Sequence, residues 1–216
     1  MLHNVYFALV VLGYRAGDLS FVYPVARGSA PAVVAVFAWM FAGEALGLWS
    51  WIGLGLASVG IGALAMGGSR AARPTPRSIG LALLTGVLIA AYTVTDGLGM
   101  RASGSPYGYI AWAFVIWGFV FVAVAFGLRR GRPVQATTRR FWASAGLSGT
   151  LSAFAYGIVL YALGAGPMAD VSALRESSVL FAAMIGALRL KEPFGGGRIA
   201  AASAIVAGLI ILKLRF

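Results

Sequence analysis

The most constraining feature of the sequence is a series of long apolar runs. The clearest extends from Tyr109 to Leu128 without a charged residue, and about 20 such residues cross the hydrocarbon core of a bilayer as one helix. The runs are continuous rather than alternating, which excludes the strands of a membrane barrel. The sequence therefore predicts an all-α integral membrane protein with about eight transmembrane helices. The eight runs are Met1–Tyr14, Ser20–Phe41, Trp51–Met66, Ile79–Gly99, Tyr109–Leu128, Phe141–Leu163, Ala169–Leu188 and Ile199–Leu212.

The composition supports this class. Hydrophobic residues make up 60% of the 216 residues and charged residues 11%, whereas a soluble domain carries about a quarter charged residues. The net charge of +11 would suit a nucleic-acid ligand, but the basic residues lie mostly in short segments between the runs, as positive-inside topology requires. We expect a small-molecule substrate and the lipid bilayer as partners, and no nucleic acid.

Residues that bind metals or catalyse reactions are scarce. The chain has no cysteine and one histidine, His3, which lies in the short first run. We therefore expect neither a metal nor a cofactor, and we interpret His3 as a packing residue. The six acidic residues form no recognisable pair for acid–base work and no nucleophile has a positioned base, so no enzymatic activity is expected.

A repeat relates the two ends of the chain. A shift of 148 positions carries Arg27 onto Arg175 and Glu44 onto Glu192. It moves the second apolar run onto the seventh, five runs later. Because five is an odd number of membrane crossings, the two halves would insert in opposite orientations. Inverted repeats are typical of secondary transporters, in which the substrate site lies where the halves meet.

The two predicted repeats differ in length. Met1 aligns with Gly149, so the 71 residues that follow the start of the second repeat near Ser78 have no counterpart in the first. We expect residues 1–67 to be a truncated first repeat, residues 68–78 a linker, and residues 79–213 a complete second repeat.

Two segments resemble a known family. "FAGEALGLWSWIGLGLASVGIGALA" and "LRLKEPFGGGRIAAASAIVAGLIIL" each place a Glu at a helix end before a short turn and a Gly-rich helix. "GDLSFVYPVARGSAP" and "AAYTVTDGLGMR" are similar to other helix openings of the same family. The chain resembles the EamA-type branch of the drug/metabolite transporter superfamily. The resemblance implies the remainder of a ten-helix inverted-repeat (5+5) bundle in the cell inner (cytoplasmic) membrane.

Two arginines lie inside apolar runs. Arg27 and Arg175 are candidates to line a substrate cavity, because intramembrane charges usually face a watery interior, and Arg offers a planar set of donors to an anion. The alternative is that each snorkels or binds backbone carbonyls near Pro24 and Pro31. The inverted repeat places the two arginines toward opposite membrane faces.

Asp96 is the acidic residue best placed for proton coupling. It lies one turn beyond Tyr92 on the same predicted helix face, and burial would favour the protonated carboxyl group. The alternative is an interfacial carboxylate paired with Arg101. Glu176 could carry a proton similarly, or neutralise the neighbouring Arg175.

Four further residues complete the predicted set. Tyr23 and Trp112 are cavity candidates, although lipid-facing packing of Trp112 is equally open. Glu44 and Glu192 end their helices, where a carboxylate opposes the helix dipole, so we expect each to cap the following helix or to pair with an arginine.

Small residues recur at four-residue spacing in two runs, which predicts close backbone packing. They are Gly53, Ala57, Ser58 and Gly62 in the third run, and Ala200, Ala204 and Gly208 in the eighth.

Basic residues are divided unequally between the two membrane faces. The face that holds the segment 67–78 carries twelve, and the other carries Arg101, Lys213 and Arg215. The positive-inside rule therefore puts that segment in the cytoplasm and Phe216 outside, whereas the family resemblance implies a cytoplasmic C-terminus. The twelve are Arg15, Arg70, Arg73, Arg77, Arg129, Arg130, Arg132, Arg139, Arg140, Arg189, Lys191 and Arg198.

The sequence thus predicts a secondary transporter that works by alternating access. Export, and a small polar or amphipathic metabolite as the substrate, are implied by the resemblance; proton coupling and a homodimer are left open. The alternatives are a non-transporting fragment or membrane scaffold protein, and a flippase for a lipid-linked substrate.

Overall fold

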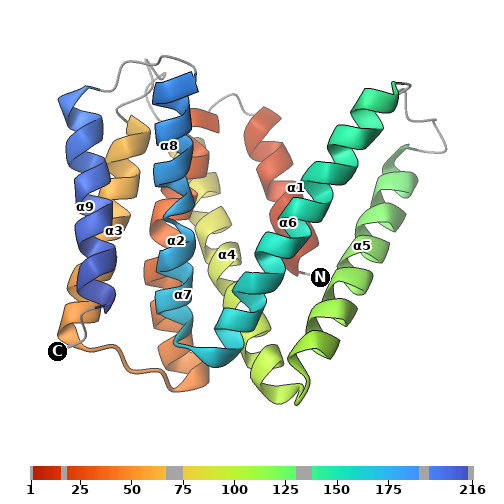
Figure 1. The fold of residues 1–216 in the computed structure, drawn as a ribbon, viewed down its shortest axis with the longest axis horizontal. Coiled ribbons are helices and arrows are strands. Elements are labelled where there is room, and N and C mark those ends of the chain that lie inside the picture. The colour runs from red at the N-terminus through yellow and green to blue at the C-terminus, as the bar shows by residue number, and fades with distance from the viewer. Residues whose placement is uncertain (1, 16–18, 67–74, 130–137, 190–194, 214–216) are drawn as a thin grey trace.

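The computed structural model describes residues 2–15, 19–66, 75–129, 138–189 and 195–213, and within these ranges the chain is helical and contains no strand (Figure 1). The side chains of some residues near helix ends, including Tyr23, lie outside the described set. The helices are α1 (Leu2–Arg15), α2 (Leu19–Ala42), α3 (Leu48–Met66), α4 (Pro76–Ala102), α5 (Pro106–Arg129), α6 (Arg139–Ala165), α7 (Met168–Arg175), α8 (Ser178–Arg189) and α9 (Gly196–Lys213).

These helices follow the predicted runs with one exception. The run Ala169–Leu188 forms two helices, α7 and α8, with a turn at Glu176 and Ser177, so the prediction of one continuous helix there is wrong. Five of the described helices, α2, α4, α5, α6 and α9, are long and apolar enough to cross a membrane. The all-α class is confirmed.

Local sequence signals define the ends of α4, the helix at the centre of the bundle. Thr75 caps its first turn by a reciprocal pair of hydrogen bonds with Ser78, and Pro76 takes the first helical position, where no backbone donor is needed. After Ala102 the backbone turns through Gly104 at φ +63°, a value that glycine adopts without strain. The short turn leads directly into α5.

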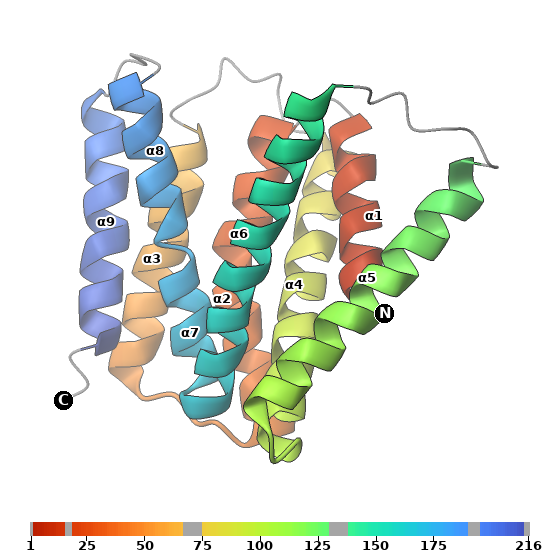
Figure 2. The same cartoon turned by 45° about the vertical axis from the view of Figure 1, so that its right-hand side comes forward.

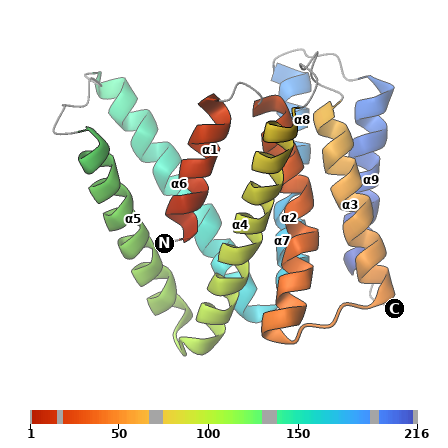
Figure 3. The same cartoon turned by 180° about the vertical axis from the view of Figure 1, so that it is seen from behind.

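The helices lie side by side, from α9 and α3 at one side of the molecule to α6 and α5 at the other (Figures 1, 2 and 3). α3 and α9 pack together at one side, and α5 and α6 lie at the other. Between them α2 contacts α3, α4 and α7, while α4 also contacts α1 and α6. α2 and α4 therefore connect the two sides and position most of the buried polar side chains described below.

The contact between α3 and α9 depends on glycine. A Cβ atom added to Gly53 would lie 2.7 Å from the carbonyl oxygen of Gly208, and one added to Gly60 would lie 2.8 Å from that of Ala201. The predicted small-residue faces are correct for Gly53, Ala57 and Gly208, which meet at this contact.

Ser58 faces α2, because its carbonyl lies 3.2 Å from where a Cβ of Gly28 would be, and Gly62 has no neighbour within 4 Å. On α9 the buried positions are Ala201, Ile205, Gly208 and Leu212, rather than Ala200 and Ala204.

The helix boundaries recur at the predicted shift of 148 positions. α3 shifted by this amount would cover 196–214, and α9 covers Gly196–Lys213; α2 would cover 167–190, and α7 and α8 together cover Met168–Arg189. α3 and α9 also run in opposite directions in Figure 1. The inverted repeat and its domain limits stay predictions, which these coincidences favour.

Candidate functional site

α7 and α8 together form one segment, and the turn between them interrupts the α-helical hydrogen bonds near the middle of this segment. The N–H of Glu176 donates to the carbonyl of Ala173 at 3.0 Å, and the N–H of Ser177 donates to that of Leu174 at 3.1 Å, so both bonds are one residue shorter than in an α-helix. Discontinuous helices of this kind line substrate and ion sites in transporters.

Three charged side chains meet at this turn. The carboxylate of Glu176, which is only 1% exposed, places Oε2 3.0 Å from Nε of Arg27 and Oε1 3.4 Å from Nε of Arg175. Arg27 also donates from Nη2 to the hydroxyl of Ser178 at 3.3 Å. Both arginines thus reach one carboxylate from different helices, and their placement toward opposite membrane faces stays a prediction. The sum of the three formal charges is +1.

Tyr92 on α4 lies next to the three charged residues Arg27, Arg175 and Glu176, and a second group of polar side chains surrounds Asp96 one turn further along α4. Nη1 of Arg175 lies 3.5 Å from the Tyr92 hydroxyl, and the guanidinium carbon lies 6.0 Å from the ring centre. Tyr92 and Asp96 are one helical turn apart on α4, and both side chains are buried. The predicted shared face is therefore present.

Asp96 is buried among hydroxyl donors rather than paired with Arg101. Tyr156 of α6 donates to Oδ2 at 2.9 Å, Tyr109 of α5 donates to Oδ1 at 3.2 Å, and Nε2 of His3 lies 3.5 Å from Oδ2. Three helices thus contribute side chains to one carboxyl group.

His3 is enclosed by aromatic rings. Its ring centre lies 3.9 Å from that of Trp117 in a stacked arrangement and 4.2 Å from that of Tyr92, and its Nε2 is 3.2 Å from the Tyr156 hydroxyl. We use the term polar cluster for the residues described so far: Arg27, Arg175, Glu176, Tyr92, Asp96, His3, Tyr109 and Tyr156.

A separate network joins three helices at the lower face of Figure 1. Glu44, just after α2, forms an ion pair with Arg101 of α4 and accepts a hydrogen bond from the backbone N–H of Met168 at 2.9 Å, at the start of α7. Arg101 also donates to the carbonyl of Gly166 at 2.8 Å. We call these four residues the Glu44 clasp. Its carboxylate lies at a helix N-terminus, where the dipole favours negative charge.

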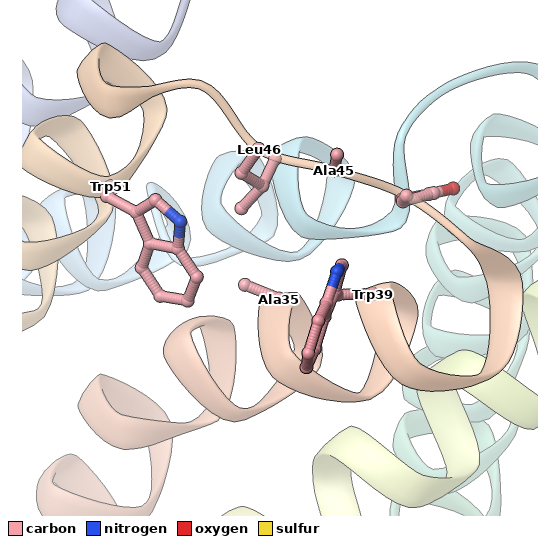
Figure 4. Close-up of a pocket in the computed structure, with 6 residues that line it drawn as sticks. Ala35, Trp39, Ala45, Leu46 and Trp51 are labelled. Atoms are coloured by element: carbon pink, nitrogen blue, oxygen red, sulfur yellow. The ribbon is translucent and has the colours of Figure 1, made fainter.

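A pocket of about 300 Å³ lies beside the clasp. Figure 4 shows Trp39 and Trp51 on either side of Ala35, with Leu46 and Ala45 of the connecting segment above them. Glu44 also lines this pocket, but its carboxylate already binds Arg101 and the Met168 amide. The other lining side chains are apolar apart from the indole N–H groups, so the pocket has little polar chemistry of its own.

The structure brings together most of the predicted residues, but not all. Arg27, Arg175, Glu176, Tyr92 and Asp96 belong to the polar cluster. Trp112 is 68% exposed on α5 and lies outside it. The side chain of Tyr23 and the whole of Glu192 lie outside the described residues.

Sequence reasoning missed His3, Tyr109 and Tyr156 as members of this cluster, whereas Trp117, which stacks on His3, is a residue that the sequence leaves open between cavity and lipid. The sequence favours a packing role for His3, and Tyr109 resembles an interfacial aromatic residue at the start of its run. Tyr156 lies in an apolar run with no nearby charge to mark it. Within the described ranges, no group of three or more His, Cys, Asp or Glu side chains is placed to hold a metal ion.

Comparison with known families identifies the fold. The family model described as the EamA-like transporter family matches residues 76–214. The chain belongs to the EamA-like transporter family. The match begins at the first residue of α4 and extends through α9, so it includes Asp96, Arg175 and Glu176. A comparison with curated proteins gives no match.

Membership of the EamA-like family assigns the chain to the multi-pass membrane transporters of the drug/metabolite superfamily. The members of this family are transporters rather than enzymes. The polar cluster therefore lies in the helix bundle of a membrane transporter, and two of its members, Arg27 and His3, come from α2 and α1, which precede the matched segment.

Proposed function

We propose that this EamA-like transporter is a secondary transporter that exports a small polar or amphipathic metabolite across the cytoplasmic membrane by alternating access, with coupling to protons. The observation that carries the proposal is the convergence of Arg27 and Arg175 on Glu176 at the break between α7 and α8. Charged side chains inside a membrane protein are costly and usually serve a substrate or ion pathway.

Alternating access requires a contact that can close one face and open again. The Glu44 clasp is suited to this because it joins α2, α4 and α7 at one face. The side chains of Arg101 and Glu44 are 33% and 14% exposed, so water can replace their contacts when the helices separate. The predicted repeat assigns Glu192 to the equivalent position at the opposite face.

Proton coupling requires a buried group that is stable both with and without a proton. As a carboxylate, Asp96 accepts hydrogen bonds from Tyr109 and Tyr156; as a carboxylic acid, it could donate to Nε2 of His3. Asp96 therefore has a partner in either state. Between Asp96 and the charges at the helix break lie His3, which is 3.5 Å from Asp96, and Tyr92, which packs against His3 and contacts Arg175.

The proposal is tested with the purified chain in proteoliposomes that contain the pH-sensitive dye pyranine. The vesicles are exposed to a panel of amino acids, small carboxylic acids, amines and neutral sugars. We expect at least one solute to cross faster than in protein-free vesicles and to change the internal pH. Solute movement without a pH change would remove the proton coupling, and no movement of any member would overturn the transport proposal.

A further inference from the structure

We infer that Arg27 and Arg175 form a binding site for a substrate carboxylate, and that Glu176 occupies this site when substrate is absent. The inference rests on the proposed function, because it names the chemical class of the transported metabolite. The two arginines come from different elements, α2 and α7, so a ligand between them would contact both predicted repeats.

The carboxylate of Glu176 lies between two guanidinium groups, in the position that we assign to a substrate carboxylate. Each of its two oxygens faces a different guanidinium group, at 3.0 and 3.4 Å. A free carboxylate of similar size could form the same two ion pairs, since each guanidinium group presents charged N–H donors to one of its oxygens. The chain therefore already holds in this place the functional group that we assign to the substrate.

The local charge also favours an anion. Two guanidinium groups against one carboxylate leave a formal charge of +1, which repels an amine. Nη2 of Arg175 is buried and has no hydrogen-bond partner among the described residues, so a donor is available for a ligand. The nearest acid on α4 is Asp96, which already accepts hydrogen bonds from two tyrosines.

The start of α8 adds to the positive potential. α8 begins at Ser178, two residues after Glu176, and Ser178 is in contact with Arg27. A helix N-terminus carries a partial positive charge that stabilises anions. Tyr92 on α4 contacts Arg175, and His3 and Tyr156 pack against Tyr92; these three side chains are polar groups without a fixed charge.

Competition between Glu176 and the substrate gives a direct test. Isothermal titration at a fixed pH of 7 measures binding of benzoate, N-acetyl-leucine and succinate, each against its amide, to the purified full chain. We expect a carboxylate to bind better than its amide. Glu176→Gln removes the competitor and should tighten carboxylate binding by about tenfold or more, leaving the amides unchanged. Arg175→Gln should abolish the preference.

Arg175→Gln is a suitable variant because it leaves Arg27 and Glu176 as a balanced pair. Arg101→Gln is the matched control, since it removes an arginine from the Glu44 clasp and should keep the preference. If Glu176→Gln is too unstable for titration, a carboxylate should raise its melting temperature more than the matching amide does.

Equal binding of acids and amides by the wild type, or no gain in Glu176→Gln, would overturn the inference. Binding of inorganic phosphate but of none of the carboxylates would overturn it as well. Carboxylate binding without transport would contradict the proposed function and leave this site intact. Transport of amines or sugars without a carboxylate preference would support the proposed function and overturn the carboxylate site.

Discussion

Nε of Arg27 lies 3.0 Å from Oε2 of Glu176, although the two residues are 149 positions apart in the chain. The pair joins α2 to the turn between α7 and α8. Arg175 supplies a second guanidinium group to the same carboxylate. Glu176 therefore faces two arginines, which makes the three residues unequal in their effect on stability.

Glu176→Gln should destabilise the protein more than Arg27→Gln. The first change removes the carboxylate that faces both arginines and should lower the free energy of unfolding by about 3 kcal/mol, whereas the second leaves Arg175 beside Glu176. Thermal unfolding in one detergent, followed by tryptophan fluorescence, measures both. Equal stability of the two variants would contradict the assignment of Glu176 as the shared counter-ion.

Asp96→Asn should remove the pH dependence of transport in proteoliposomes. The amide keeps the shape of the side chain and can still contact Tyr156 and Tyr109, but it cannot take up or release a proton. Tyr107→Phe is the control, because Tyr107 is exposed on α5 and should leave the pH profile unchanged. A pH profile of Asp96→Asn that matches the wild type would instead direct attention to Glu176.

Glu44→Gln should loosen the lower face of the bundle. The chain contains no cysteine, so Ala38→Cys provides a single reporter at a buried position of α2, near the clasp. Loss of the charge-assisted contacts to Arg101 and Met168 should speed labelling of this cysteine by a maleimide about tenfold, because such contacts contribute about 1.5 kcal/mol or more. An unchanged labelling rate would mean that the clasp does not limit opening.

Gly53→Ala and Gly55→Ala should change stability in opposite directions. Alanine is favoured over glycine inside a helix by about 1 kcal/mol. A Cβ at position 55 meets nothing within 4 Å, whereas one at position 53 would overlap the Gly208 carbonyl and Leu212 of α9. Gly53→Ala should therefore lower the free energy of unfolding by about 1–3 kcal/mol. Thermal unfolding of the two variants side by side tests the close approach of α3 and α9.

The sequence was sufficient for features set by local pattern. Apolar runs separated by charged segments locate the helices, because each span must satisfy its own backbone in lipid. The repeat of Arg27 at Arg175 also indicated which segments correspond, and the helix boundaries recur at the same shift.

Features that depend on tertiary contacts could not be predicted in the same way. The break after Arg175 has no Gly or Pro to mark it, and the sequence offered no reason to pair Arg27 with an acid in a distant segment. His3 could not be placed beside Asp96, since their contact requires α1 to pack against α4. The sequence identifies which residues are unusual, while the packing of distant helices decides which of them meet.

Two fluorescent-protein fusions in a bacterial host should determine the orientation of the chain. α4, α6 and α9 begin at the upper face of Figure 1, where Arg77, Arg139, Arg140 and Arg198 lie, whereas α4 and α9 end at the lower face, where Arg101 and Lys213 lie. The positive-inside rule makes the upper face cytoplasmic. A fusion within residues 67–78 should then be bright, and a fusion at Phe216 dark, because the reporter does not mature when it is exported unfolded. The family resemblance implies a cytoplasmic C-terminus, so strong fluorescence at Phe216 would show that the count of basic residues does not set the topology.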